Sequence, residues 1–234
     1  MDSTLGANIG LFAIWTQGDW VTKSVAVMLL VMSVTSWIVI FIKALDVVKY
    51  KGLSQKTEAF WHSESFEAGL SELGSQETNP FVQLALAGRE ATAHHRNAQT
   101  QLHDTLDISD WVVRTLRNSI DDSTARFQAG LAILASVGST APFVGLFGTV
   151  WGIYHALMGI SSEGMATIDK VAGPIGESLI MTALGLAVAI PAVLGYNALV
   201  RGNKGILTRL NRFAHDLHSY FVTGARVGTG TVRA

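Results

Sequence analysis

The chain has 234 residues, of which 49% are hydrophobic and 15% charged, and its mean hydropathy is +0.33. Because a soluble domain usually carries about 25% charged residues, this composition excludes an ordinary soluble protein and indicates that part of the surface faces lipid. The net charge of −1 gives no excess of basic residues of the kind that indicates nucleic-acid binding. The absence of cysteine excludes disulfides, thiolate zinc sites and iron–sulfur clusters.

Three stretches nearly free of charge predict three transmembrane helices. Residues 24–42 have no charged side chain, 127–162 have only His155, and 171–200 have only Glu177. Because a helix needs about 20 apolar residues to cross a membrane, we expect transmembrane helices at 22–43, 136–160 and 172–197. The other segments are an N-terminal segment (1–21), a helical domain (44–135), a loop (161–171) and a C-terminal helix and tail (198–234).

The basic residues predict the orientation of these helices. None of the Lys and Arg residues falls in 1–20, nine fall in 43–126, one in 163–170 and six after residue 200. Since cytoplasmic segments are enriched in Lys and Arg, we expect the N-terminus and the 161–171 loop in the periplasm. The 44–135 domain and the C-terminus are then cytoplasmic, and the chain is a multi-pass protein of a bacterial inner membrane.

Apolar periodicity extends two of these helices into the cytoplasm. A seam in steps of four and three runs from Leu102 to Phe127 and predicts one long helix that starts near residue 100 and enters the second span. A second seam (Ile206, Leu210, Phe213, Leu217 and Tyr220) prolongs the helix of the third span. Residues 45–98 are expected to form shorter amphipathic helices.

Stripes of small residues mark the second and third spans. In lipid, such residues let helix backbones approach closely, so we predict helix packing at these glycines: Gly138, Gly145, Gly148, Gly152, Gly159 and Gly185. Packing within one subunit would explain most of them. The stripes are also polar, through Thr149, Ser178 and Thr182, whereas the first span has a lipid-facing character. We therefore expect the small, polar faces of spans two and three to line a shared surface or space at a subunit interface.

Glu177 is the only acidic residue inside a predicted span. Ionisable residues within membranes usually face an interior or a wet cavity, so Glu177 is predicted to belong to a polar pathway. The alternative is that it lies near the outer end of its span and reaches the headgroups. Lys23 is interpreted as an anchor of that kind, and His155 as an interfacial histidine.

No enzyme motif is complete. The glycine-rich run 145–152 lacks the Lys–Ser/Thr pair that would hold phosphate and Mg²⁺, and neither a Ser/His/Asp set nor an HExxH motif is present. No carboxylate spacing turns His94, His95 and His103 into a metal site. We expect no enzymatic activity, no cofactor and no metal.

Two long motifs resemble a known family. Residues 139–153 (STAPFVGLFGTVWGI) and 171–197 (VAGPIGESLIMTALGLAVAIPAVLGYN) are similar to the second-span and third-span signatures of the ExbB/TolQ/MotA proton-channel family. The resemblance implies an all-α membrane protein that assembles as a ring-shaped homo-oligomer, a pentamer in this family, with spans two and three lining a pore. It also implies that Thr149 and Thr182 are pore-lining hydroxyls and that Glu177 is the pore glutamate.

The resemblance further implies partners and a task. An ExbD-like protein would occupy the pore, and the proton motive force would energise a TonB-like protein for import of iron–siderophores and vitamin B12 across the outer membrane. The run Asp169–Pro174 favours the ExbB branch over the TolQ branch of the Tol-Pal envelope system. A small-solute transporter would require inverted repeats, which the three unrelated spans do not provide. A scaffold in which Glu177 only packs is a further alternative.

Overall fold

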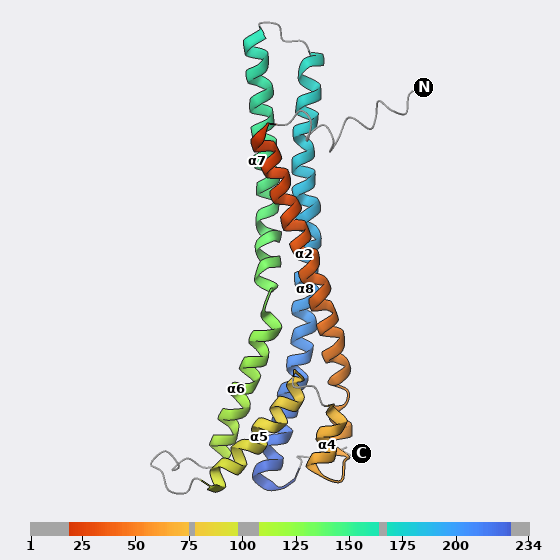
Figure 1. Cartoon of the computed structure of the whole chain (residues 1–234), viewed down its shortest axis with the longest axis vertical. Coiled ribbons are helices and arrows are strands. Elements are labelled where there is room, and N and C mark those ends of the chain that lie inside the picture. Colours follow the sequence, from red (N-terminus) through yellow and green to blue (C-terminus); the bar gives the residue numbers. More distant parts are fainter. Residues whose placement is uncertain (1–18, 75–77, 98–107, 164–167, 226–234) are drawn as a thin grey trace, which may run out of the picture. The chain divides into compact units, whose positions relative to one another are not determined.

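The computed structural model describes residues 19–74, 78–97, 108–163 and 168–225, and all its elements are helices (Figure 1). Three helical stretches, which include α2, most of α7 and most of α8, are long and apolar enough to cross a membrane. This confirms the predicted all-α class with three long apolar helices. The elements are α2 (Trp20–Leu53), α3 (Thr57–Trp61), α4 (Phe66–Leu73), α5 (Pro80–Asn97), α6 (Ile108–Gln128), α7 (Leu131–Glu163) and α8 (Ile168–Thr223).

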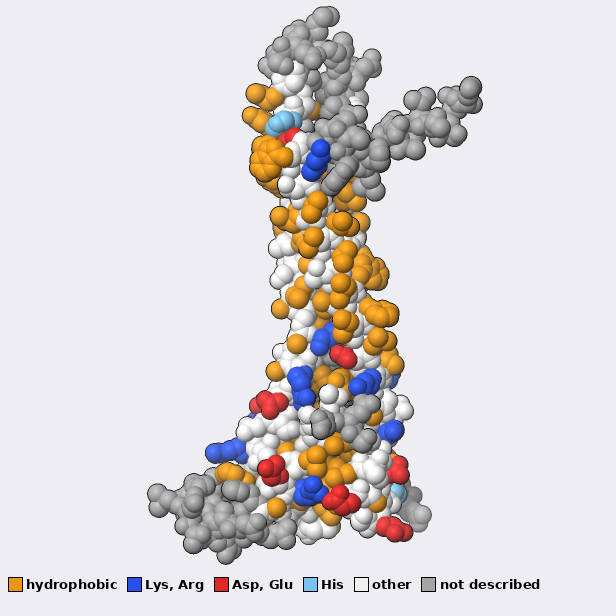
Figure 2. Space-filling view, viewed as in Figure 1, with side chains coloured by type: hydrophobic (Ala, Val, Ile, Leu, Met, Phe, Trp, Pro, Cys, Tyr) orange, Lys and Arg blue, Asp and Glu red, His pale blue; other side chains and the backbone are white. Residues whose placement is uncertain are grey.

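The chain divides into two compact units. One, here called the apolar unit, comprises Met1–Lys43 and Gly130–Leu199, and the other, the charged unit, comprises Ala44–Ala129 and Val200–Ala234. Hydrophobic side chains cover much of the visible face of the apolar unit, whereas Lys, Arg, Asp and Glu side chains lie over the charged unit (Figure 2). Each unit has a core of its own.

The apolar unit buries small and medium-sized side chains and exposes large ones. Trp37 and Phe41 on α2, Phe143 on α7 and Leu194 on α8 are all more than half exposed. A contiguous apolar surface of this kind requires lipid or another protein to cover it. The core between the helices consists of Val25, Leu29, Val137, Ala141, Met181, Ala189 and Ala192.

The charged unit has an aromatic and aliphatic core. The predicted seam of α8 contributes to it, since Ile206, Leu210, Phe213 and Leu217 are buried, while Tyr220 is 36% exposed. Helix α6 contributes Val112 and Leu116, and the shorter helices supply the remainder. The largest fully buried side chains from α4 and α5 are Leu73, Phe81 and Leu84.

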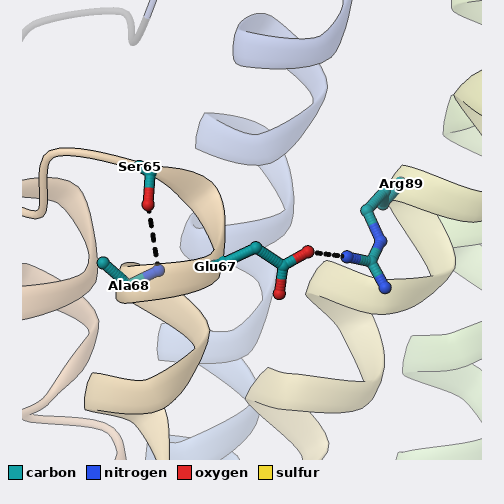
Figure 3. A network of polar contacts seen from close by, with 4 residues as sticks. All are labelled: Ser65, Glu67, Ala68 and Arg89. Atoms are coloured by element: carbon teal, nitrogen blue, oxygen red, sulfur yellow. Dashed lines mark hydrogen bonds and ion pairs between the residues drawn. The ribbon is translucent and has the colours of Figure 1, made fainter.

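Helix α4 shows how the short helices are stabilised at the surface of the charged unit (Figure 3). The Ser65 hydroxyl caps its first turn by accepting a hydrogen bond of 3.2 Å from the backbone N–H of Ala68. Glu67 in the same turn forms an ion pair with Arg89 of α5. The side chains of Arg89 and Glu67 are 46% and 74% exposed, so solvent weakens the ion pair and the cap contributes more to stability.

Two sequence predictions are wrong in detail. The long helix expected from residue 100 into the second span is interrupted after Gln128, and α7 begins at Leu131. Gly130 has a φ of +85°, a left-handed conformation that glycine adopts without a steric penalty and that ends helices. The first span was expected to give way to short helices at residue 45, but α2 continues to Leu53. Leu102 and Leu106, from the predicted seam, lie outside the described residues.

A buried asparagine stabilises the end of α6. Asn203 on α8 donates a 2.8 Å hydrogen bond from its side-chain nitrogen to the carbonyl oxygen of Phe127, in the last turn of α6. Carbonyl groups in the last turn of a helix have no intrahelical partner, so this bond satisfies one that is buried.

Asn203→Ala is therefore expected to lower the free energy of unfolding by about 1–3 kcal/mol, the penalty for a buried unpaired carbonyl. Asn211→Ala is the matched control, because Asn211 is exposed and, among the described residues, its side chain bonds to the Leu207 carbonyl of its own helix. Its expected effect is below about 0.5 kcal/mol. Denaturation of both variants in detergent measures the difference, and equal losses would contradict this role of Asn203.

Candidate functional site

Glycines bring the backbones of α7 and α8 into contact. A Cβ atom added to Gly145 would lie 2.5 Å from the carbonyl oxygen of Met181, and one added to Gly185 would lie 2.6 Å from the carbonyl oxygen of Ala141. No real side chain tolerates such distances to backbone atoms. These two glycines therefore define the closest approach of the two helices.

The other predicted packing glycines differ in their surroundings. A Cβ atom on Gly138 would lie 2.5 Å from Cγ2 of Val193, and one on Gly152 would lie 2.2 Å from Oγ of Ser178. Gly148 faces both Val25 of α2 and Met181 of α8. A Cβ atom on Gly159 would meet no described atom within 4 Å, and the packing role of Gly159 stays a prediction.

Three hydroxyl-bearing residues meet at this close approach. Thr149 Oγ1 of α7 lies 2.5 Å from Thr182 Oγ1, 3.0 Å from the Ser178 carbonyl oxygen and 3.2 Å from the Gly145 carbonyl oxygen. Thr149 and Ser178 are buried, and Thr182 is half-buried. Because a threonine hydroxyl has one hydrogen and two acceptor positions, Thr149 donates to one of these oxygens at a time. The direction of donation can change by rotation of a hydroxyl, without movement of the backbone.

Glu177 directly precedes this group of residues in α8. Its backbone is helical, and its side chain lies outside the described part of the structure. The helix therefore brings residue 177 next to Ser178 along the chain, while the role of the carboxyl group stays a prediction. The side chains of His94 and His95, and all of His103, likewise lie outside the described part.

A second polar group, at the start of α2, was missed by the sequence reasoning. Asp19 accepts a 2.9 Å hydrogen bond from the backbone N–H of Thr22 and a 2.6 Å hydrogen bond from the indole Nε1–H of Trp151. Nε2 of His155 lies 3.8 Å from the same carboxylate. An acidic residue just before an apolar run is the usual N-cap signal and could have identified Asp19, but nothing in the sequence points to its partner Trp151.

The Asp19 carboxyl group is held in its charged form. Burial raises the pKa of Asp19, but the hydrogen bonds from Thr22 and Trp151 and the nearby His155 lower it by more, so the net pKa lies below the ordinary aspartate value. His155, predicted to be interfacial, is half-exposed beside this carboxylate.

Comparison with known proteins assigns the chain to a class. Residues 80–212 match the MotA/TolQ/ExbB proton channel family, and the chain belongs to this family. The matched range includes the close approach of α7 and α8 and its three hydroxyl-bearing residues.

Individual relatives refine this assignment. The chain is 42% identical to the biopolymer transport protein ExbB of Xanthomonas campestris pv. campestris, over 91% of this chain and 86% of that protein. It is 39% identical to the protein of the same name from Neisseria meningitidis, over 90% of this chain and 96% of the relative. The Tol-Pal system protein TolQ of Pseudomonas aeruginosa is 33% identical, over 94% and 95% of the two chains.

Proposed function

We propose that the chain is a proton-channel subunit of the ExbB type, which uses the proton motive force together with an ExbD-like partner to energise a TonB-like protein. The observation that carries this proposal is the identity of 39–42% to proteins named ExbB along nearly the whole chain. The transported cargo would be iron–siderophores and vitamin B12, taken up by outer-membrane receptors.

In this proposal α7 and α8 line the pore. Thr149, Thr182 and Ser178 supply a hydroxyl and carbonyl surface where the two helices meet, and Glu177 supplies the ionisable group. Moving one charge through 100 mV yields about 2.3 kcal/mol, so a few protons are sufficient to drive a mechanical step. The work requires no nucleotide.

The proposed assembly is a ring of identical subunits, a pentamer, in a bacterial inner membrane. The large exposed apolar side chains of the apolar unit support coverage by lipid and by neighbouring subunits. The distribution of Lys and Arg supports a periplasmic N-terminus and a cytoplasmic C-terminus.

The second candidate is a TolQ-type subunit of the Tol-Pal system. It is favoured by the TolQ relative, which matches 94% of this chain, more of it than either ExbB relative above, although at lower identity.

Copurification separates the two candidates. An affinity-tagged full chain, expressed at its native level and isolated in mild detergent, is expected to retain ExbD-like and TonB-like proteins, identified by mass spectrometry. An unrelated inner-membrane protein with the same tag is the control. Retention of TolR-like and TolA-like proteins instead would reject the ExbB assignment in favour of the TolQ one.

A further inference from the structure

One carboxylate joins two helices of the apolar unit. Oδ1 of Asp19 caps the first turn of α2 by accepting from Thr22, and Oδ2 accepts from the indole of Trp151 on α7. These two bonds, of 2.9 and 2.6 Å, use different oxygens of the same group, so the cap and the link to α7 are formed together. Hydrogen bonds to a charged group are among the stronger ones in proteins.

This link acts on a face of α7 different from the one that carries Thr149. Gly148, Trp151 and His155 are spaced by three and four residues and share one side of the helix, which meets α2 at Val25 and Asp19. Thr149 lies about 200° around the helix from Trp151 and meets α8 instead. The contact with Asp19 therefore holds α7 on the side of the helix opposite to its hydroxyl-bearing side.

His155 adds a titratable group to the same carboxylate. Its ring lies 4.8 Å from the Trp151 ring, and its Nε2 is 3.8 Å from Oδ2 of Asp19, too far for a hydrogen bond but close enough for an ion pair. The proximity of His155 is one of the causes that lower the pKa of Asp19, so it helps to keep this carboxylate charged.

Two further titratable groups lie near this pair on its own helices. On α2, Lys23 follows Asp19 by one turn, and its backbone N–H donates to the Asp19 carbonyl oxygen. On α7, the ring of Tyr154 lies 5.7 Å from that of His155. The tests below therefore change Asp19 and its partner Trp151 directly.

We propose that Asp19 is a positioning residue that holds α7 against the start of α2 through Trp151. The proposal deepens the proposed function, on which its consequence for proton-driven work rests: the hydroxyl-bearing side of α7 is presented in one position.

Asp19→Asn separates the link from the cap. Asparagine caps helices as well as aspartate does, so its amide oxygen retains the bond from Thr22. The amide nitrogen then faces the indole N–H, and two donors cannot bond. Trp151→Phe is the complementary change, because it removes the donor and keeps an aromatic ring.

Hydrogen exchange of the full chain in lipid nanodiscs, read by mass spectrometry, tests the link. The exchange rate over 150–158 is expected to rise about tenfold in Asp19→Asn and in Trp151→Phe, which is the effect of losing one hydrogen bond to a charged group. The double variant is expected to show no further rise, because both changes remove the same bond. Exchange in the first turn of α2 is expected to stay unchanged in Asp19→Asn. Unchanged exchange over 150–158, or additive effects in the double variant, would overturn the proposal.

The hydrogen-exchange test is separate from the test of the proposed function. Because these readouts need no partner, they stand or fall independently of the copurification result, and loss of ExbD-like partners would reject the proposed function alone.

Discussion

Gly145→Leu is expected to disrupt the pair formed by α7 and α8 and, with it, assembly of the proposed oligomer. The first carbon of the new side chain would lie 2.5 Å from the Met181 carbonyl oxygen and 3.0 Å from Cα of Gly185. These are backbone atoms, which cannot rotate away, so the helices must separate. Overpacking usually costs about 1–3 kcal/mol per site, and an oligomer of identical subunits repeats it in every copy.

Matched variants make this prediction specific. Gly152→Leu is expected to be milder, because its first carbon meets Oγ of Ser178, a side-chain atom that can change rotamer. Gly205→Leu adds the same isobutyl group at an exposed position of α8 where no described atom lies within 4 Å, and it is expected to assemble normally. Gel filtration in mild detergent gives the oligomeric state, and thermal unfolding gives the stability. An unchanged oligomer for Gly145→Leu, or an equal loss for Gly205→Leu, contradicts the packing role.

Glu177→Ala is expected to abolish uptake of iron–siderophores under iron limitation while the oligomer still assembles. The residue is the only acid in a predicted span, and it precedes Ser178, whose carbonyl oxygen accepts a hydrogen bond from Thr149. Alanine removes an ionisable group that is costly to place in a membrane, so assembly is not impaired. Growth on a siderophore as the sole iron source, at matched expression, measures the loss.

Glu177→Gln distinguishes two roles for the carboxyl group. Glutamine keeps the shape and the neutral hydrogen bonding, so retained uptake indicates a carboxyl that acts in its protonated form. Loss of uptake equal to that of alanine indicates that the charge or its titration is required. Normal uptake by Glu177→Ala at normal expression would remove Glu177 from the proposed pathway and leave it as an interfacial side chain.

The long helices could be predicted from the sequence because they depend on composition and periodicity. The near absence of charged residues identified the apolar parts of α2, α7 and α8. The seam of apolar residues from Ile206 to Leu217 predicted the helical extension of α8. The end of α6 could not be predicted in this way. Gly130 lies within an otherwise helical pattern, and a glycine there is compatible with a continuous helix as well as with a left-handed terminus.

The contacts between helices were predictable only in part. Small residues at helical spacing indicated a packed face, and Gly145 and Gly185 do bring two backbones together. The spacing carried no information about which neighbour each glycine meets, so Gly145, which meets backbone atoms, could not be distinguished from Gly152, which meets a side chain. The Asp19–Trp151 bond joins residues 132 positions apart, and such a pairing emerges only once α2 and α7 lie side by side.

The contact between Gly145 and Gly185 limits how this molecule can move. A shift of α7 along α8 by one helical turn, about 5.4 Å, would place Ala141 or Thr149 opposite Gly185, where even a methyl group overlaps with backbone. A one-turn shift is therefore blocked, and the two helices move as one rigid pair. If proton flow produces a power stroke, the sliding or rotating surfaces must lie outside this pair, between subunits or against a partner helix.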